Sequence, residues 1–295
     1  MTQAELTPVQ AIAGTLFKRD DLYRPYADIP LSGGKVRQCE MLLQSRLTEI
    51  QEKHHGTIAT CTSVDSPQGI IVASVAHKLG LQSILGVGGR VDFSKHPMLQ
   101  YCEQEYGTEL KILSGIAYNS TLTAKMEEYR KTRPHYLVKF GINLESDAEA
   151  ILGSIATQVQ NLPADLENLV IPCGSAITMA GILIGLHRYK IKPKRIVGIQ
   201  IAGIDRRKDI DKILMQHLNF IEMQRLKYEF ILDKQYPYSR KVKAEVAPDF
   251  ILDPIYEAKA YERAVKENLL NSNSLFWVVG DSQPVRDFTA SRVRR

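Results

Sequence analysis

The stretch LSGGKVRQCE, residues 31–40, places Lys35 directly after two glycines and before a run that predicts a helix. Glycines allow a backbone to approach a bound ligand closely. Two interpretations follow: a phosphate sits on the loop, or the lysine amine takes part in chemistry. A lysine in a partly desolvated pocket loses its proton more easily and can form a Schiff base with a carbonyl compound. Without the flanking glycines, a solvated lysine near a helix start is the simpler interpretation.

A second loop, in IPCGSAITMAG, lies between an apolar run that ends at Pro172 and a helix that begins near Thr178 or Ala180. A tight turn from strand to helix exposes backbone N–H groups at the positive end of the helix, which suits a phosphate. The loop is no Walker A motif, because the Gly-Lys-Ser/Thr ending is missing. The alternative is an ordinary helix start, capped by the hydroxyl of Ser175 or Thr178.

A third polar loop, TSVDSPQG, precedes a helix that we expect to begin near Pro67, since proline suits the first helical turn. Ser66 is then a natural N-cap. The functional interpretation makes Ser66 and Gln68 hydrogen-bond donors to a bound carboxylate. A phosphate loop combined with a reactive lysine is the pair of parts that pyridoxal 5′-phosphate (PLP) requires.

The elements that position these loops form a repeating pattern along the chain. Short apolar runs such as GTIATCTS, LQSILGVGG, ENLVIPCGS and RIVGIQIAG alternate with amphipathic stretches of helical length. This alternation predicts β-α-β units, parallel sheets and helices on both faces of each sheet. Ligands of open α/β sheets bind at the carboxyl ends of the strands, here residues 62–68, 88–91, 140–145, 173–178, 202–205 and 280–282.

The composition limits the classes of protein to which the chain can belong. The 295 residues are 44% hydrophobic and 24% charged, which is typical of a soluble globular chain. No apolar run is long enough to span a bilayer and the start of the chain lacks a signal layout, so we expect a cytoplasmic protein without a membrane partner. The spacing of the four cysteines predicts reduced, mostly buried thiols and no metal site. The charge of +5 does not by itself argue for nucleic acid, and the tail SRVRR is read as a frayed end.

The motifs together resemble the PLP-dependent fold-type II enzymes, and most closely the family of 1-aminocyclopropane-1-carboxylate (ACC) deaminase and D-cysteine desulfhydrase. The resemblance rests on FKRDD, LSGGKVRQCEMLL, TSVDSPQGIIVASVAHKLGL, CGSAITMAGILIGL, FILDPIYEAKAYERAV and VVGDS, which span residues 17 to about 282. It implies a tryptophan synthase β-like fold of two open parallel-sheet α/β domains with PLP in the cleft. The large PLP-binding domain would comprise 1–49 and 156–295, and a smaller inserted domain 50–155.

The resemblance also implies roles for single residues. Lys35 would form the Schiff base, and Ser66 and Tyr256 would lie close to the reacting atoms. The phosphate would be cradled by Gly174, Ser175, Ala176, Ile177 and Thr178. Glu257 would approach the pyridine nitrogen, unless the neutral Ser282 faces it. A further tyrosine would be Tyr236 or Tyr238, and the sequence does not decide between them.

The chain departs from the family pattern at several of these positions. Pro67 stands where an asparagine usually lies beside the cofactor hydroxyl, and Gln68 would substitute for it. Ala176 and Ile177 replace glycines of the phosphate loop, and Gly34 replaces an asparagine. The substrate-side segment FGINLES replaces a glycine-rich stretch. These changes predict retained cofactor binding with a substrate other than the family's common one.

Three functions compete. The first is a PLP-dependent lyase or deaminase that acts at the α-carbon of a small amino acid by elimination, deamination or decarboxylation. The second is a PLP enzyme for an amino acid already attached to a DNA base, as in bacteriophages that hypermodify thymidine. The third is a non-catalytic module that binds a phosphate ligand. The resemblance further implies a homodimer.

Overall fold

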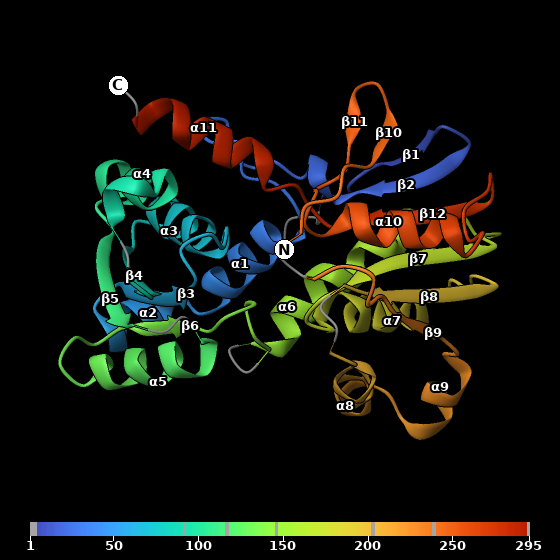
Figure 1. Ribbon diagram of the computed structural model, residues 1–295. Coiled ribbons are helices and arrows are strands. Elements are labelled where there is room, and N and C mark those ends of the chain that lie inside the picture. Colours follow the sequence, from blue (N-terminus) through green and yellow to red (C-terminus); the bar gives the residue numbers. More distant parts are fainter. Residues whose placement is uncertain are drawn as a thin grey trace. The chain divides into compact units, whose positions relative to one another are not determined.

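The computed structural model describes residues 5–90, 92–115, 118–144, 147–201, 204–237 and 240–293. The chain divides into two compact units, which are described one at a time (Figure 1). The first unit consists of Met1–Tyr23, Ser32–Gly34 and Leu152–Asp281. The second consists of Arg24–Leu31, Lys35–Ile151 and Ser282–Arg295.

The first unit is built on a six-stranded sheet in the order β1-β2-β12-β7-β8-β9. Its strands are β1 (Val9–Ile12), β2 (Thr15–Arg19), β7 (Asn168–Cys173), β8 (Arg195–Gln200), β9 (Glu229–Leu232) and β12 (Ser274–Val278). Neighbouring strands from β2 to β9 run parallel, whereas β1 pairs with β2 antiparallel. A separate antiparallel pair joins β10 (Glu245–Ala247) to β11 (Phe250–Ile251).

Helices cover both faces of this sheet, with α7 (Ile177–Arg188) and α10 (Glu257–Lys266) on opposite sides (Figure 1). The helix α7 has glycines where it meets the last residues of α6 (Ala148–Ala156). A Cβ on Gly185 would lie 2.5 Å from the carbonyl oxygen of Ala156, and one on Gly181 would lie 2.8 Å from the Ile155 side chain. Every residue of β7 is buried, so each apolar side chain contributes about 1.5–3 kcal/mol of transfer free energy.

The motif FKRDD has a structural role inside the first unit. Lys18 is fully buried, and its Nζ donates to the carbonyl oxygen of Thr7 at 2.7 Å and to Oδ1 of Asn161 at 2.6 Å. Asp20 accepts from Nε1 of Trp277 at 3.0 Å, which ties the end of β2 to β12. Buried charged groups cost free energy unless they are hydrogen-bonded, so this network specifies one position for β2.

The remaining helices of the first unit complete its surface. They are η1 (Asp20–Leu22), η3 (Thr157–Asn161), α8 (Arg207–His217) and α9 (Phe220–Arg225). Asn219 and Glu222 form a capping box at the start of α9, which explains why a helix of only two turns begins there.

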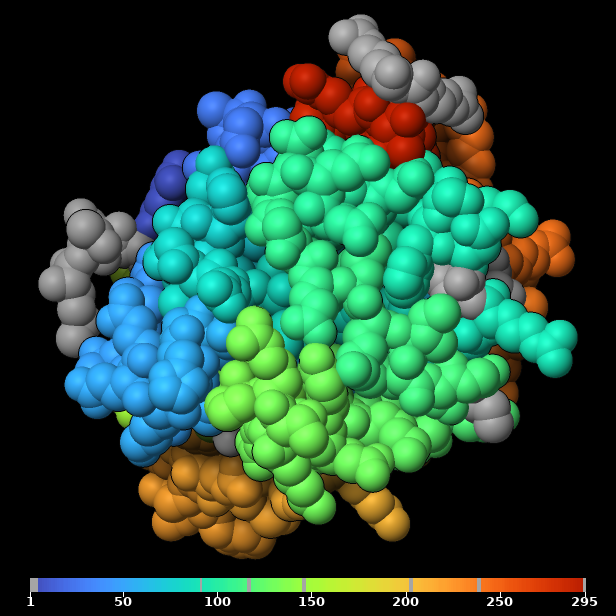
Figure 2. Space-filling view, turned by 90° about the vertical axis from the view of Figure 1, so that its left-hand side faces the viewer, coloured from blue at the N-terminus to red at the C-terminus, as the bar shows by residue number. Residues whose placement is uncertain are grey.

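The second unit contains a four-stranded parallel sheet in the order β5-β4-β3-β6. Its strands are β3 (Thr57–Thr62), β4 (Gln82–Gly88), β5 (Glu109–Ser114) and β6 (Tyr136–Val138). Its helices are α1 (Gly34–Ser45, from Lys35 onward), α2 (Leu47–His54), α3 (Gln68–Lys78), η2 (Phe93–Lys95), α4 (Pro97–Tyr106), α5 (Asn119–Arg130) and α11 (Gln283–Val293). Figure 2 looks onto this unit, whose outer face is built by residues coloured from blue to green.

The predicted α/β fold with parallel sheets is confirmed, and each of the four quoted apolar runs forms a strand. One correction concerns the first sheet, which is not wholly parallel because the hairpin of β1 and β2 adds an antiparallel edge. That hairpin turns at Ala13 and Gly14, both at positive φ, which suits a tight turn. Its short, half-buried first strand has no long apolar run to announce it.

The predicted domain bounds, 1–49 with 156–295 and 50–155, remain a prediction. The compact units differ from them because 24–31, 35–49 and 282–295 group with the second unit. The helix α11 belongs there because it packs against α4, where the rings of Tyr101 and Phe288 lie 5.6 Å apart.

The four cysteines are free and buried, as expected: Cys39, Cys61, Cys102 and Cys173. Across the described residues, no helix combines the length and apolar character needed to cross a membrane.

Candidate active site

The predicted phosphate loop follows β7 and leads into α7 within the first unit. Ala176 is the N-cap residue of α7 and adopts a left-handed conformation, with φ at 73°. No side chain caps the helix start. The alternative in which the hydroxyl of Ser175 or Thr178 closes this end is therefore wrong. The first N–H groups of a twelve-residue helix are left for another acceptor, which suits a phosphate oxygen.

Tyr256 lies directly against this loop. A Cβ on Gly174 would lie 2.8 Å from Oη of Tyr256 and 3.1 Å from its ring, so only glycine fits there. The side chain of Asp253 accepts hydrogen bonds from the backbone N–H groups of Ile255 and Tyr256, at 2.9 and 3.0 Å. The LDPIY segment thus uses Asp253 to fix the turn that aims the tyrosine. Tyr256 is half-buried.

Glu257, the first residue of α10, is 1% exposed, although an acid in the first turn of a helix is usually exposed to solvent. Burial raises the pKa of its carboxyl well above the ordinary value, and the nearby charge of Asp253 raises it further. Oε1 of Glu257 accepts from the backbone N–H of Gly280 at 3.0 Å. The carboxyl therefore holds the chain just past the end of β12.

Lys35 is placed by the two glycines that precede it. Gly34 donates its N–H to the carbonyl oxygen of Val279 at 2.8 Å. Gly33 has φ at 99°, and a Cβ on it would lie 2.7 Å from both Cα of Gly280 and the carbonyl oxygen of Val279. This backbone-to-backbone contact fixes the residue before Lys35 at the carboxyl end of β12. Neighbouring strands lie about 5 Å apart, and β7 with its phosphate loop is the next strand.

The Lys35 side chain itself is exposed in the structure. The partly desolvated pocket expected from the sequence is therefore not provided by its surroundings as described. Desolvation of this amine would have to come with the bound cofactor.

The loop before α3 behaves differently from the phosphate loop. The N-cap residue of α3 is Pro67 and no side chain caps the helix there, so the prediction of Ser66 as N-cap is wrong by one residue. Ser66 Oγ still accepts from the backbone N–H of Gln68 at 3.3 Å. Gln68 is fully buried. Its Nε2 donates to Oγ1 of Thr60 at 3.0 Å and to the carbonyl oxygen of Lys139 at 3.1 Å, and its Oε1 accepts from the N–H of Gly141 at 2.6 Å.

Gln68 thus braces the segment after β6, a role that the sequence analysis missed. Its partners in that segment, Lys139 and Gly141, are more than 70 residues away in the chain, so no local sequence signal indicates them. A contact between Gln68 and a cofactor stays a prediction, and it would replace one of these bonds.

The other predicted site residues are partly described. Ser282 is half-buried, two residues after Gly280. Tyr236 Oη lies 3.2 Å from Oε1 of Glu262 and accepts from Nε2 of Gln235 at 2.6 Å. Tyr238 lies outside the described residues, so the choice between the two tyrosines stays open. The carboxyl-end ranges predicted at 88–91, 140–145 and 202–205 also extend beyond the described residues, at Val91, Glu145, Ala202 and Gly203.

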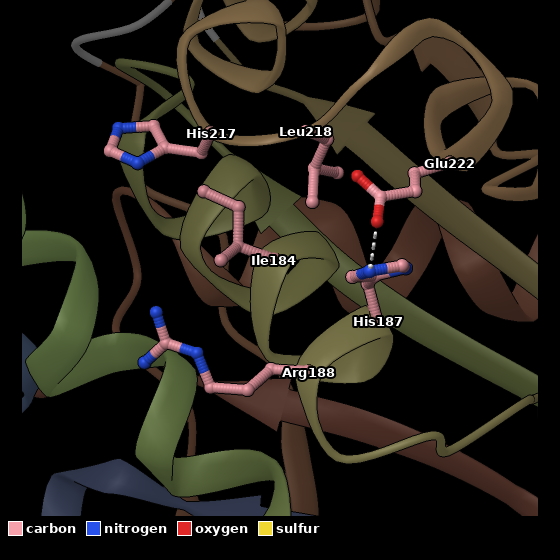
Figure 3. Close-up of a pocket in the computed structure, with 6 residues that line it drawn as sticks. All are labelled: Ile184, His187, Arg188, His217, Leu218 and Glu222. Carbon is pink, nitrogen blue, oxygen red and sulfur yellow. Dashed lines mark ion pairs between the residues drawn. The ribbon is translucent and has the colours of Figure 1, made fainter.

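A separate hollow of about 270 Å³ lies at the other end of α7, between that helix, α8 and α9 (Figure 3). His187 Nε2 faces Glu222 across it at 3.2 Å. Because α7 is twelve residues long, this hollow lies about 18 Å from the phosphate loop. It is therefore not part of the candidate site. The described residues include no group of three or more His, Cys, Asp or Glu that could hold a metal ion.

The residues at the carboxyl edge of the first unit, with Lys35 directly following Gly34 in the chain, fit a cofactor that carries a phosphate and an aldehyde. The uncapped start of α7 offers N–H donors, Tyr256 stands over the loop, and Lys35 continues from the glycines held at the end of β12. Glu257 adds a buried acid beside the same strand. This set can bind a phosphate, present an amine and exchange protons.

Comparisons with known proteins agree with this arrangement. A protein-family model described as "Pyridoxal-phosphate dependent enzyme" matches residues 6–218. A Pyrococcus furiosus protein, provisionally named a 1-aminocyclopropane-1-carboxylate deaminase, is 24% identical over 285 residues, covering 86% of this chain and 82% of that protein. The O-seryl-dTMP PLP-dependent decarboxylase of Salmonella phage ViI is 23% identical over 346 residues, covering 93% of this chain and 80% of that protein.

Among solved structures, the crystal structure of an ACC deaminase homologue superposes with a TM-score of 0.74 at 19% identity. The match covers 100% of this chain and 94% of that one. At this level of identity the likeness establishes the fold, and it confirms the fold-type II architecture expected from the sequence.

Proposed function

Since this chain belongs to the family of pyridoxal-phosphate dependent enzymes, we propose that it breaks a bond at the α-carbon of an amino-acid substrate and that Lys35 binds the cofactor covalently. Elimination, deamination and decarboxylation all begin at that carbon. The non-catalytic phosphate-binding module finds no support in the comparisons.

The observation that carries the proposal is a convergence within the first unit. The bond from Gly34 to Val279, the uncapped start of α7 and the Tyr256 ring against Gly174 all lie at the carboxyl edge of one sheet. Because β12 and β7 are adjacent, Lys35 continues the chain about one strand spacing from the phosphate loop. This is the edge where open α/β sheets bind their ligands.

The bound cofactor supplies a conjugated ring that accepts the electron pair left at the α-carbon. The chain's own residues do the rest. The N–H groups at the start of α7 hold the phosphate, and Gly174 to Thr178 form its cradle. The Lys35 amine, once released, takes or gives a proton at the α-carbon, and Tyr256 Oη exchanges a second one.

Two residues compete to face the ring nitrogen. Glu257 carries a proton on a buried carboxyl, which would strengthen the electron sink if that proton is shared with the ring. Ser282 offers a neutral hydroxyl, which leaves a weaker sink and favours elimination or simple proton transfer. Ser66 remains the proposed neighbour of the substrate.

A second candidate substrate is an amino acid attached to a DNA base. The relative from Salmonella phage ViI, named for an O-seryl-dTMP substrate, aligns with 93% of this chain. Pro67 and the segment FGINLES already point away from the family's common substrate.

We also propose a cytoplasmic homodimer, which light scattering on a sizing column would test by giving about twice the monomer mass of 33.2 kDa.

The test is visible absorption after mixing with PLP and dialysis. Wild type is expected to keep a yellow band from the covalent bond to Lys35, and Lys35→Ala to lose it. Lys95→Ala is the matched control, since Lys95 is an exposed lysine paired only with Asp92 at 3.2 Å, and it is expected to keep the band. An undiminished band in Lys35→Ala would overturn the assignment.

A further inference from the structure

Three strand ends lie side by side at the carboxyl edge of the first sheet. Cys173 at the end of β7 pairs with Gln200 at the end of β8, and Gln200 pairs with Leu232 at the end of β9. Just beyond, Ile201 donates its N–H to Cys173 and Asp233 donates its N–H to Gln200. The segments after β8 and β9 therefore start about 5 and 10 Å from the start of the phosphate loop.

Both segments are rich in cations. Residues 204–208 and 233–243, as far as they are described, carry seven basic side chains: Arg206, Arg207, Lys208, Lys234, Arg240, Lys241 and Lys243. Three are paired: Arg206 with Asp209, Arg207 with Asp205, and Lys243 with Glu245. The other four are exposed and have no ion-pair partner among the described residues.

The start of the second segment, residues 233–237, is held in place by hydrogen bonds. Asp233 Oδ1 accepts from the N–H of Gln235, and Lys266 on α10 donates to the Gln235 side chain at 2.7 Å. Lys259 Nζ, also from α10, donates to the carbonyl oxygen of Pro237 at 3.2 Å. A braced loop loses less conformational entropy when it binds a partner.

One aromatic ring stands among these cations. The guanidinium of Arg240 lies over the Tyr236 ring, 4.9 Å from its centroid. A guanidinium held over an aromatic ring keeps a fixed position and still presents its N–H groups to a phosphate oxygen. A free amino acid has one carboxylate and cannot engage four separated cations.

We propose that these two segments form a docking surface for the phosphate backbone of DNA, which delivers a base-linked amino acid to the neighbouring cofactor site. The surface consists of Lys208, Lys234, Arg240 and Lys241, with the Tyr236 ring beneath Arg240. The inference rests on the proposed function, because it names the substrate class for the same site. It favours the base-attached substrate over a free amino acid.

The sequence offers a matched control at the opposite edge of the same sheet. Residues 188–194, before β8, carry Arg188, Lys190, Lys192 and Lys194, all exposed. They follow the far end of α7, and β8 separates them from the carboxyl edge by about 20 Å. Removal of three lysines there changes the net charge as much as removal of three cations from the docking surface.

The experiment measures binding of the PLP-loaded protein to a fluorescent DNA duplex of about 20 base pairs with unmodified thymine, from about 50 to 200 mM salt. Wild type is expected to bind with a steep loss of affinity as salt rises. The triple variant Lys234→Ala, Arg240→Ala, Lys241→Ala is expected to bind at least about tenfold more weakly, with the slope of log K against log salt reduced by about 3. The variant Lys190→Ala, Lys192→Ala, Lys194→Ala is expected to stay within about threefold of wild type.

Three results would overturn the proposal: no binding at the lowest salt, equal weakening by the two triple variants, or tighter binding to anionic lipid vesicles than to DNA. The yellow band separates this failure from failure of the proposed function. A protein that forms the band and ignores DNA keeps its enzymatic assignment and loses the docking surface. A protein that binds DNA as expected but never forms the band loses the catalytic assignment.

Discussion

Two helix starts, those of α3 and α7, follow buried parallel strands and look alike in sequence, yet the structure finishes them differently. At α3, Ser66 accepts from the N–H of Gln68, and the Gln68 amide forms three hydrogen bonds within the protein, to Thr60, Lys139 and Gly141. At α7, no side chain closes the end and Ala176 takes a left-handed conformation. The start of α3 is tied to its own unit by the bonds of Ser66 and Gln68, whereas the start of α7 has no side-chain cap and is the proposed phosphate site.

The largest effect should come from removing the hydrogen bonds of Gln68 at the start of α3. Gln68→Met keeps the length of the side chain but removes its hydrogen bonds to Thr60, Lys139 and Gly141. Buried polar partners left unsatisfied should lower the free energy of unfolding by about 2 to 4 kcal/mol. Urea unfolding measures the loss. Gln44→Met, on the exposed side of α1, should change it by less than about 0.5 kcal/mol, and similar losses in both variants would refute the bracing role.

The second largest effect should come from adding a methyl group at Gly174, in the loop before α7. Gly174→Ala puts a methyl group 2.8 Å from Oη of Tyr256, so the ring or the loop must move. Overpacking of this kind costs about 2 kcal/mol, and we expect a PLP affinity lower by a factor of about 30 in a spectral titration. Gly153→Ala, which meets open space in α6, is the control and should keep wild-type affinity. Unchanged PLP affinity in Gly174→Ala would contradict the cradle.

The buried carboxyl of Glu257 should make the free energy of unfolding depend on pH. The folded-state pKa of Glu257 lies above its ordinary value of 4.5, so the folded state holds a proton that the unfolded state releases. Its contribution to stability is complete below pH 4.5 and is lost as pH rises through the folded pKa. Glu257→Gln should remove this decline, so its unfolding free energy relative to wild type should rise with pH. A constant difference across the range would mean that Glu257 is ionised in the folded state.

The smallest effect should come from replacing the left-handed Ala176 at the start of α7 with glycine. Ala176→Gly removes the steric cost of a left-handed alanine, about 1–2 kcal/mol, and adds entropy to the unfolded chain. The net expectation is a gain of about 0.5 to 1 kcal/mol in unfolding free energy. Ala180→Gly, in the helix interior, should instead lose about 1 kcal/mol. A loss at both positions would mean that the left-handed turn carries no strain.

The starts of α3 and α7 also show how much of the structure could be predicted from the sequence. The apolar runs of β3 and β7 predicted both strands and both helices, because burial on two faces leaves a continuous hydrophobic signal. The loops at their ends could be located but not told apart. Ser66 and Ser175 are both small hydroxyl residues before a helix, and only distant partners such as Gly141 distinguish the two sites.

Glu257 and α11 show the same limit. In the sequence, Glu257 reads as an exposed first-turn acid, and its burial follows from the packing of α10 on the sheet. The helix α11 groups with the second unit through α4, whose residues lie far away in the chain. The predicted roles of Lys35, Tyr256 and the phosphate cradle came from resemblance and remain proposals, although the structure gathers their surroundings at one sheet edge.

The contact between Gly33 and Gly280 has a consequence for how the protein is made. Ribosomes build a chain from its N-terminus, so Lys35 emerges early and Gly280 long afterwards. The backbone contact that positions the lysine cannot form until the strand β12 has been synthesised and has joined the sheet. The lysine proposed to bind the cofactor is therefore synthesised long before the strand end that positions the glycines in front of it.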